Sequence, residues 1–159
     1  MPTASASITR PADTTAYTAN DVVGAAAAAL TFAGLGSPDG SDIIITSATL
    51  RRNQNAVISG ETTYRLHLYN VTPPSAPADN AAWDLPSGDR ASYLGYIEFT
   101  SIADMGSTLW VEANSLNKQV KLLSGNLYAL LVTVGAYTPV SADTYDLTVS
   151  AIPAHNQTN

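Results

Sequence analysis

Apolar and polar residues alternate strictly in several short runs along this chain. The run from Asp42 to Arg52 divides into two faces, one with Ile44, Thr46, Ala48 and Leu50 and the other with Ile43, Ile45, Ser47 and Thr49. The run from Thr62 to Tyr69 places Tyr64, Leu66 and Leu68 inward and Thr63, Arg65, His67 and Tyr69 outward. Tyr93 to Thr100 and Thr144 to Ile152 repeat the pattern. A period of two residues predicts β-strands with one buried face.

Shorter apolar runs predict further strands at Asp21–Gly24, Thr108–Val111 and Gln119–Leu122. Leu127 to Val134 is apolar on both faces, which predicts a central strand covered by the opposite sheet and by a loop or a subunit. Ser124–Asn126 is expected to form a tight hairpin turn. Only Ala25–Ala29 favours helix, and its strand-like flanks instead predict a strand or an irregular crossing.

The pattern as a whole predicts an all-β protein, a single antiparallel β-sandwich of about eight to ten short strands. We expect an N-terminal arm over residues 1–20, in which Met1–Ser7 is flexible. A sandwich domain follows over residues 21–153, and a polar tail over residues 154–159.

One long segment, residues 70–91, interrupts the strands. Pro73, Pro74, Pro77 and Pro86 keep it out of regular structure, and a loop of this length is commonly a binding loop or a disordered one. Trp83 favours order, because disordered segments rarely carry large apolar rings.

The composition of the chain disfavours several classes of function. Charged residues make up 13% of the chain, about half the usual share, and the formal net charge of −6 comes without a basic cluster, which disfavours binding to nucleic acid. The chain has no cysteine, and its N-terminus lacks the apolar core of a secretory signal. The apolar run Ala25–Ala33 is too short to cross a bilayer. The sequence thus predicts a soluble protein made without an export signal.

Candidate chemistry is sparse. The two histidines, His67 and His155, are expected at the surface without catalytic partners, and no metal or cofactor site is predicted. The loop residues Asp79, Asp84 and Asp89 could ligate calcium, although aspartate is also a common turn former. A carboxylate pair drawn from Glu61, Glu98 and Glu112 stays open as a distant alternative. The aromatic residues Trp83, Tyr69 and Tyr96 could form a sugar platform, with core packing or a subunit interface favoured.

Three blocks of the sequence resemble a family of small structural proteins of tailed bacteriophages. They are ITRPADTTAYTANDVVG (Ile8–Gly24), the segment from Tyr69 to Phe99, and NLYALLVTVGAYTPVSADTYDLTVSA (Asn126–Ala151). The most distinctive parts are RPADTTAY in the first block and DNAAW, DR and YLG in the second. Ala25–Ala29 stands where relatives often have a more polar segment.

The resemblance implies a jelly-roll decoration or cement protein, trimeric and bound to the major capsid protein on the outside of a phage head. It would be made in the host cytoplasm and would have no enzymatic activity, cofactor or membrane contact. The candidate interface residues are Trp83, Asp84, Arg90, Tyr69, Tyr96 and Leu131. The alternative is a carbohydrate- or receptor-binding module of a phage tail or fibre.

Overall fold

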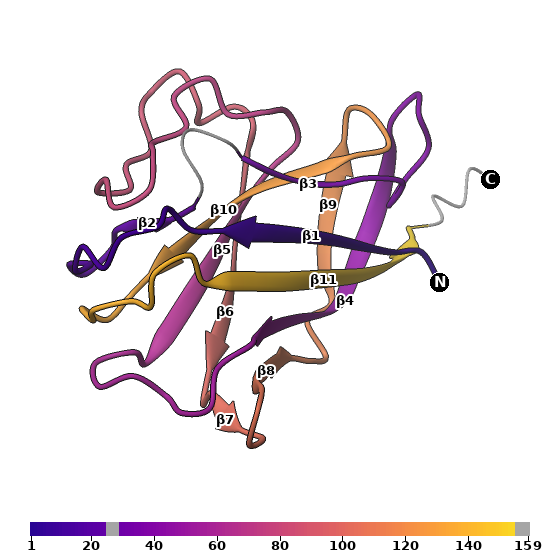
Figure 1. Cartoon of the computed structure of the whole chain (residues 1–159). Coiled ribbons are helices and arrows are strands. Elements are labelled where there is room, and N and C mark those ends of the chain that lie inside the picture. Colours follow the sequence, from indigo (N-terminus) through magenta and orange to yellow (C-terminus); the bar gives the residue numbers. More distant parts are fainter. Residues whose placement is uncertain (25–28, 155–159) are drawn as a thin grey trace.

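The computed structural model describes residues 1–24 and 29–154, and these residues form an all-β fold without helix (Figure 1). No helix in this part of the chain could therefore span a membrane. The run Ala25–Ala29 and His155 lie wholly or mostly outside the described residues. Eleven strands occur in the described residues: β1 Thr3–Thr9, β2 Val22–Val23, β3 Leu30–Phe32, β4 Ser41–Arg52, β5 Thr63–Tyr69, β6 Tyr93–Thr100, β7 Ala103–Asp104, β8 Leu109–Ala113, β9 Lys118–Leu122, β10 Leu127–Thr133 and β11 Thr144–Pro153.

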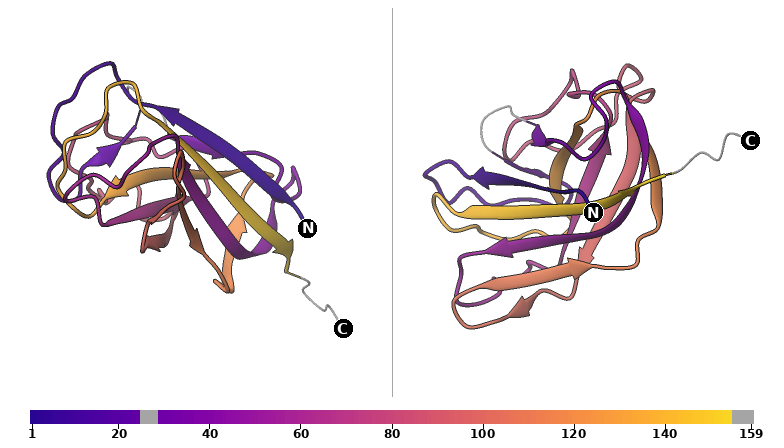
Figure 2. Two further views of the ribbon diagram at one scale, coloured as in Figure 1. Left: turned by 60° about the horizontal axis from the view of Figure 1, so that its bottom comes forward. Right: turned by 90° about the vertical axis from the view of Figure 1, so that its right-hand side faces the viewer.

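The strands form two antiparallel sheets that pack face to face (Figure 2). The first sheet has the order β1-β11-β4-β8-β7, with β9 paired to the other half of β4. The second has the order β2-β10-β5-β6, with β3 also paired to β10. Buried side chains from both inner faces form one core, which confirms the predicted antiparallel sandwich.

The strand pairs are nested along the sequence. β1 pairs with β11, β3 with β10, β4 with β9, and β5 with β6. A long antiparallel hairpin that is rolled up produces this nesting, and the rolling brings β11 beside β4 and β10 beside β5. This is the connectivity of a jelly roll, an architecture used by viral capsid and lectin domains among others.

The N-terminal arm is the first correction to the predictions. Residues 3–9 form β1, paired along its whole length with β11, and its alternate residues Ala4 and Ile8 are buried. Small side chains gave this strand too weak an apolar signal, but alanine is enough to cover a core at a sheet edge. The segment predicted as a flexible arm is therefore part of the sandwich.

The faces of β4 need a second correction. Ile43 and Ile45 are buried, and so are Ala48 and Leu50, which belong to the opposite phase of the alternation. Thr46 lies between the two phases. The pairing with β11 passes from Ile45–Ala151 to Ser47–Ser150, so Thr46 has no opposing residue and forms a β-bulge. A bulge switches the inward face halfway along the strand, which the two-residue period alone could not show.

The turn at Ser124–Asn126 differs from its prediction. It is not a hairpin turn, because β9 before it pairs with β4 in the first sheet and β10 after it pairs with β3 and β5 in the second. The turn carries the chain from one sheet to the other, and a crossing of this kind looks like a hairpin in sequence.

Candidate functional site

The loop of residues 70–92 lies over the outer side of the second sheet, beside β2 (Figure 1). Backbone hydrogen bonds join it to the chain before and within β2: Val22 N donates to Ala81 O at 2.9 Å, and Asn80 N donates to Val22 O at 2.9 Å. Trp83 N donates to Asn20 O at 2.9 Å. The loop thus adds an irregular strand-like segment beside β2, so its central part is ordered by pairing as well as by its prolines.

Trp83 is the aromatic anchor of the loop. Its half-buried indole stacks on the ring of His67 in β5, with centroids 3.8 Å apart and planes 24° apart. The indole Nε1 donates to the Tyr69 hydroxyl at 3.2 Å. Trp83, which favoured an ordered loop in the sequence, therefore fixes the loop to a sheet of the same chain.

His67 is buried beneath this indole and is 4% exposed, so its prediction as a surface residue is wrong. Its Nδ1 lies 2.9 Å from the Tyr93 hydroxyl. Burial, and then the nearby charge of Arg65, lowers the pKa of His67 to about 4. The imidazole is neutral at pH 7 and serves as a flat support for Trp83. The outward position of His67 in β5 was predicted correctly, but the cover supplied by the loop was not.

A second anchor, Asp79, holds the loop four residues before Trp83. The Asp79 carboxylate, 8% exposed, accepts hydrogen bonds from the Tyr17 hydroxyl at 2.6 Å and from Gly24 N at 2.9 Å, and it pairs with the Arg10 guanidinium at 3.3 Å. Arg10 also donates to the Tyr17 hydroxyl. Burial, and then the hydrogen bond to Asp79, raises the pKa of Tyr17. We call Arg10, Tyr17 and Asp79 the loop clamp.

The loop clamp joins two segments that are far apart in sequence. Arg10 and Tyr17 are the first and last residues of RPADTTAY, and Asp79 is the first residue of DNAAW. Tyr17 also contacts Tyr137 of the third block, with ring centroids 5.2 Å apart and Tyr17 N donating to Tyr137 O at 2.9 Å. The blocks named in the sequence therefore meet at one place, around the attachment of the loop.

The predicted interface residues divide into three groups. Tyr69, Trp83 and Tyr96 gather around His67, and Tyr96 remains 44% exposed, with the Arg65 guanidinium 4.8 Å from its ring centroid. Asp84 and Arg90 are exposed on the loop. Leu131 is 1% exposed and packs in the core between the sheets, so its prediction as an interface residue is wrong.

The three glutamates occupy separate environments. Glu61 is buried against Arg52, Glu98 pairs with Arg65 at 2.8 Å on the outer side of β6, and Glu112 is exposed on β8 and accepts from Asn114. They do not face one cleft, so the geometry offers no carboxylate pair of the kind that hydrolyses glycosides.

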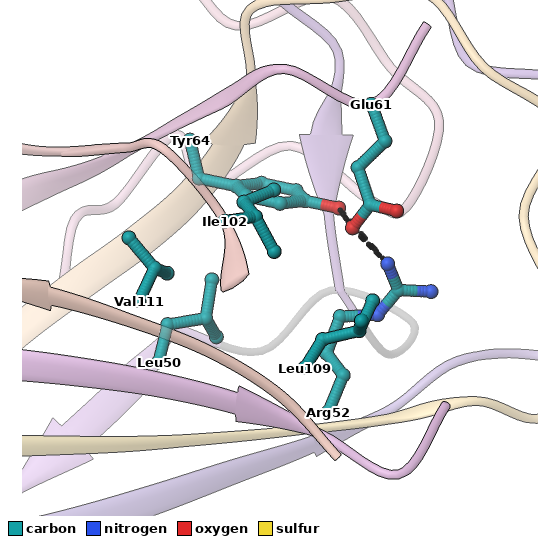
Figure 3. A pocket seen from close by; sticks show the side chains of 7 residues that line it. All are labelled: Leu50, Arg52, Glu61, Tyr64, Ile102, Leu109 and Val111. Atoms are coloured by element: carbon teal, nitrogen blue, oxygen red, sulfur yellow. Dashed lines mark hydrogen bonds and ion pairs between the residues drawn. The ribbon is translucent and has the colours of Figure 1, made fainter. Parts of the chain in front are cut away.

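A buried charge cluster at the end of β4 was missed by the sequence reasoning. The Arg52 guanidinium pairs with Glu61 and with Asp143, and Glu61 also accepts from the Tyr64 hydroxyl at 2.7 Å (Figure 3). Leu50, Leu109 and Val111 enclose the cluster on one side and leave no room for a water molecule. It holds strand ends together and has no access for a substrate. The sequence alone gives no signal that pairs Arg52 with Asp143, which lies 91 positions away.

The candidate calcium ligands are not brought together as a site. Asp79 is engaged in the loop clamp, Asp89 is buried beside Ser75, and Asp84 is exposed. Within residues 1–24 and 29–154, no three acidic or histidine side chains are placed to hold a metal ion.

Comparisons with known proteins find similarity in structure and none in sequence. No protein-family model and no curated protein matches the chain. The solved structure "Capsid of Ralstonia phage GP4" aligns with 97% of this chain and 84% of that chain, at 13% identity and a TM-score of 0.47. Eiger TNF from S. frugiperda aligns with 100% and 99% of the two chains, at 10% identity and a TM-score of 0.39. The structure of Tomato Aspermy Virus aligns with 99% and 80%, at 8% identity and a TM-score of 0.35.

At these identities and scores, the similarity carries no argument about what the chain binds. The class that its own strand order defines is a jelly-roll β-sandwich, here with a long loop fixed to the outside of one sheet.

Proposed function

We propose that this chain is a non-enzymatic structural protein of a bacteriophage virion. In this proposal it is a decoration, or cement, protein that binds the major capsid protein on the outer surface of the head and stabilises the shell as a homotrimer. The observation that carries the proposal is the loop clamp: the sequence segments that resemble phage structural proteins, RPADTTAY and DNAAW, contact each other through Arg10, Tyr17 and Asp79.

The clamp suits a binding role. A loop that is fixed before it meets a partner loses less conformational entropy on binding than a free loop does. Here both ends of the short segment from Asp79 to Trp83 are fixed, one by Asp79 and the other by Trp83, while Asp84 and Arg90, which follow Trp83 in the loop, remain exposed. The exposed side of the loop is therefore a preformed surface that a shell could contact.

One of the sequence arguments for a trimer, the second apolar face of β10, is removed by the structure. The second apolar face of β10, which suggested a subunit contact, is covered inside the chain: Leu130 is 3% and Val132 is 1% exposed in a single protomer. The low charge content and the family resemblance remain in support of the trimer. Sedimentation equilibrium at micromolar concentration is expected to give three times the 16.6 kDa chain mass, and a plain monomer would contradict this part of the proposal.

Binding to shells tests the proposal as a whole. Shells of the encoding phage that lack this protein are mixed with it and sedimented, and saturable co-sedimentation is expected. The shells should also withstand a higher temperature or lower salt after decoration. The absence of both effects would refute the decoration role.

One observation favours the alternative role in carbohydrate binding. His67 covers one face of the Trp83 indole, and the half-buried ring can offer its other face to a sugar. The exposed Tyr96 ring lies against the same imidazole, with centroids 5.5 Å apart. A glycan array of the wild type beside Trp83→Ala would show spots that are lost in the variant if this role holds.

A further inference from the structure

Strand β1 forms one edge of the first sheet, and β7 lies at the opposite edge. The ladder with β11 fixes which backbone groups face outward: Ala151 N donates to Pro2 O and Arg10 N donates to Asp143 O, both at 2.9 Å. Hydrogen-bonded pairs alternate along an antiparallel ladder, so the even-numbered residues between these two bond to β11. The N–H and C=O groups of Thr3, Ser5, Ser7 and Thr9 consequently point away from the sheet.

In the described part of the chain, no strand is hydrogen-bonded to these outward groups, although β3 of the second sheet approaches β1. Thr3, Ser5, Ser7 and Thr9 are exposed. Natural sheets protect such edges with charges, prolines, bulges or very short strands. β1 has none of these devices: it is seven residues long, has the sequence TASASIT, and pairs with β11 without a register shift.

The strand is also held in shape before any partner arrives. Side-chain hydrogen bonds tie its outer face to β11, from Thr3 to Ser150 at 3.2 Å, from Ser5 to Thr148 at 2.9 Å and from Ser7 to Asp146 at 2.6 Å. An incoming strand would meet a straight and ordered template, which lowers the entropy lost on pairing.

An uncharged pocket lies at the beginning of β1. It has a volume of about 260 Å³ and is lined by Pro2, Leu35, Ile43 and Pro153, together with the Gly34–Ser37 turn and Ser41. Pro2 directly precedes β1, so a strand that follows the edge reaches the pocket at one end. A pocket of this size and lining fits one apolar side chain.

We propose that the β1 edge accepts an extended segment of the capsid protein as an additional strand. The segment pairs with Thr3, Ser5, Ser7 and Thr9 over roughly seven residues, and it places one apolar side chain in the pocket beside Pro2. Backbone donors and acceptors at strand spacing recognise another polypeptide. This inference rests on the proposed decoration role and names the contact through which it is exerted.

A second copy of this chain is the competing occupant. Two β1 strands could pair antiparallel around a two-fold axis through the same outward groups. A two-fold contact is closed within a pair and leaves the third protomer of a trimer without a partner. The proposed three-fold assembly therefore leaves the β1 edges free for a different chain.

A matched pair of variants tests the inference. Ser5→Pro removes one outward N–H and fills its place with the proline ring, while it leaves the hydrogen bonds to β11 intact. Ser5→Ala loses the same side-chain contact with Thr148 and keeps the N–H. In co-sedimentation with undecorated shells, we expect Ser5→Pro to bind at least tenfold more weakly than wild type and Ser5→Ala to bind within about twofold of it.

Equal binding by the two variants would overturn the β1 contact while the decoration role stands; failure of the wild type to bind would overturn both. Hydrogen exchange of the wild type gives a second measurement that needs no variant. The amides of Thr3, Ser5, Ser7 and Thr9 should exchange fast in the free protein and slowly on shells. Slow exchange of these amides in the free protein, or a dimer of the free protein that Ser5→Pro dissolves, would contradict the proposal.

Discussion

Asp79→Ala should detach the central part of the loop and destabilise the protein by about 3 kcal/mol. The substitution removes the acceptor for the Tyr17 hydroxyl and for Gly24 N, and it removes the ion-pair partner at 3.3 Å from Arg10. Breaking a buried ion pair typically costs about 3–5 kcal/mol, because the remaining charge stays buried without compensation. The lower end applies here because Arg10 keeps Asp13 at 3.5 Å and the Val140 carbonyl at 3.1 Å.

Asp79→Asn removes the charge of the side chain and keeps its size, so it measures the contribution of the charge alone. The amide oxygen can still accept from Tyr17 and from Gly24 N, while the ion pair with Arg10 is lost. Hydrogen bonds to charged groups are stronger than those to neutral ones by about 1 kcal/mol each, so we expect a loss of about 1–2 kcal/mol. Asp84→Ala is the matched control, since Asp84 is exposed on the same loop.

Urea unfolding followed by circular dichroism measures the stability of these variants. In a Trp110→Phe background, Trp83 is the remaining tryptophan, and its fluorescence reports on the loop. Asp79→Ala should shift this emission to longer wavelength before the sheets unfold. If Asp79→Ala and Asp84→Ala unfold at the same urea concentration with the same emission, the clamp does not hold the loop and the reasoning fails.

Three further predictions concern the covered face and the core. Trp83→Ala should cost about 2 kcal/mol, because the indole is half-buried, and should weaken shell binding with the β-sheet circular dichroism unchanged; equal binding and equal melting would contradict it. His67 has a pKa of about 4 when folded and about 6.5 when unfolded, so its contribution to stability is present above pH 6.5 and is lost as the pH falls toward 4. Urea unfolding at pH 7.5 and 4.5 should show a loss roughly 2 kcal/mol larger for wild type than for His67→Gln, and equal losses would contradict it. Leu131→Asp buries an unpaired carboxylate in the core and should cost several kcal/mol, so an unchanged melting temperature would show that Leu131 is not inside.

The strands were predictable where apolar residues are large and alternate without interruption. β5, β6 and β11 fall within one residue of their predicted bounds, and the predicted inward residues of β5, Tyr64, Leu66 and Leu68, are buried in the core. These predictions succeeded because large side chains such as leucine, isoleucine and tyrosine make the two-residue alternation of apolar and polar positions easy to see. The prediction missed β1 for the same reason, because two of its three inward residues are alanine, which gives only a weak apolar period.

The environment of the site was harder to predict than the strands. An outward residue on a strand is expected in solvent, and only a tertiary contact can bury it. His67 and Tyr69 are outward on β5 and yet buried, because a loop that follows them in sequence folds back over them. The loop and its tryptophan were visible in the sequence, but the face on which they lie depends on Asp79 meeting Arg10, 69 positions away.

Several of the few charged residues are buried, so the surface of the protein carries even less charge than its composition indicates. Within residues 1–24 and 29–154, six charged residues are buried: Arg10, Asp21, Arg52, Glu61, Asp89 and Asp143. The whole chain has seven basic and thirteen acidic residues. The surface is therefore poorer in charge than the composition alone indicates, and the edge at β1 has no charge within the strand. Charge depletion is typical of the centres of protein interfaces. The ion pairs of Arg10 with Asp79 and of Arg52 with Glu61 and Asp143 lie inside. In the proposed decoration role, a surface of hydroxyl groups, backbone and a fixed loop can then be buried against neighbours while few charges are removed from water.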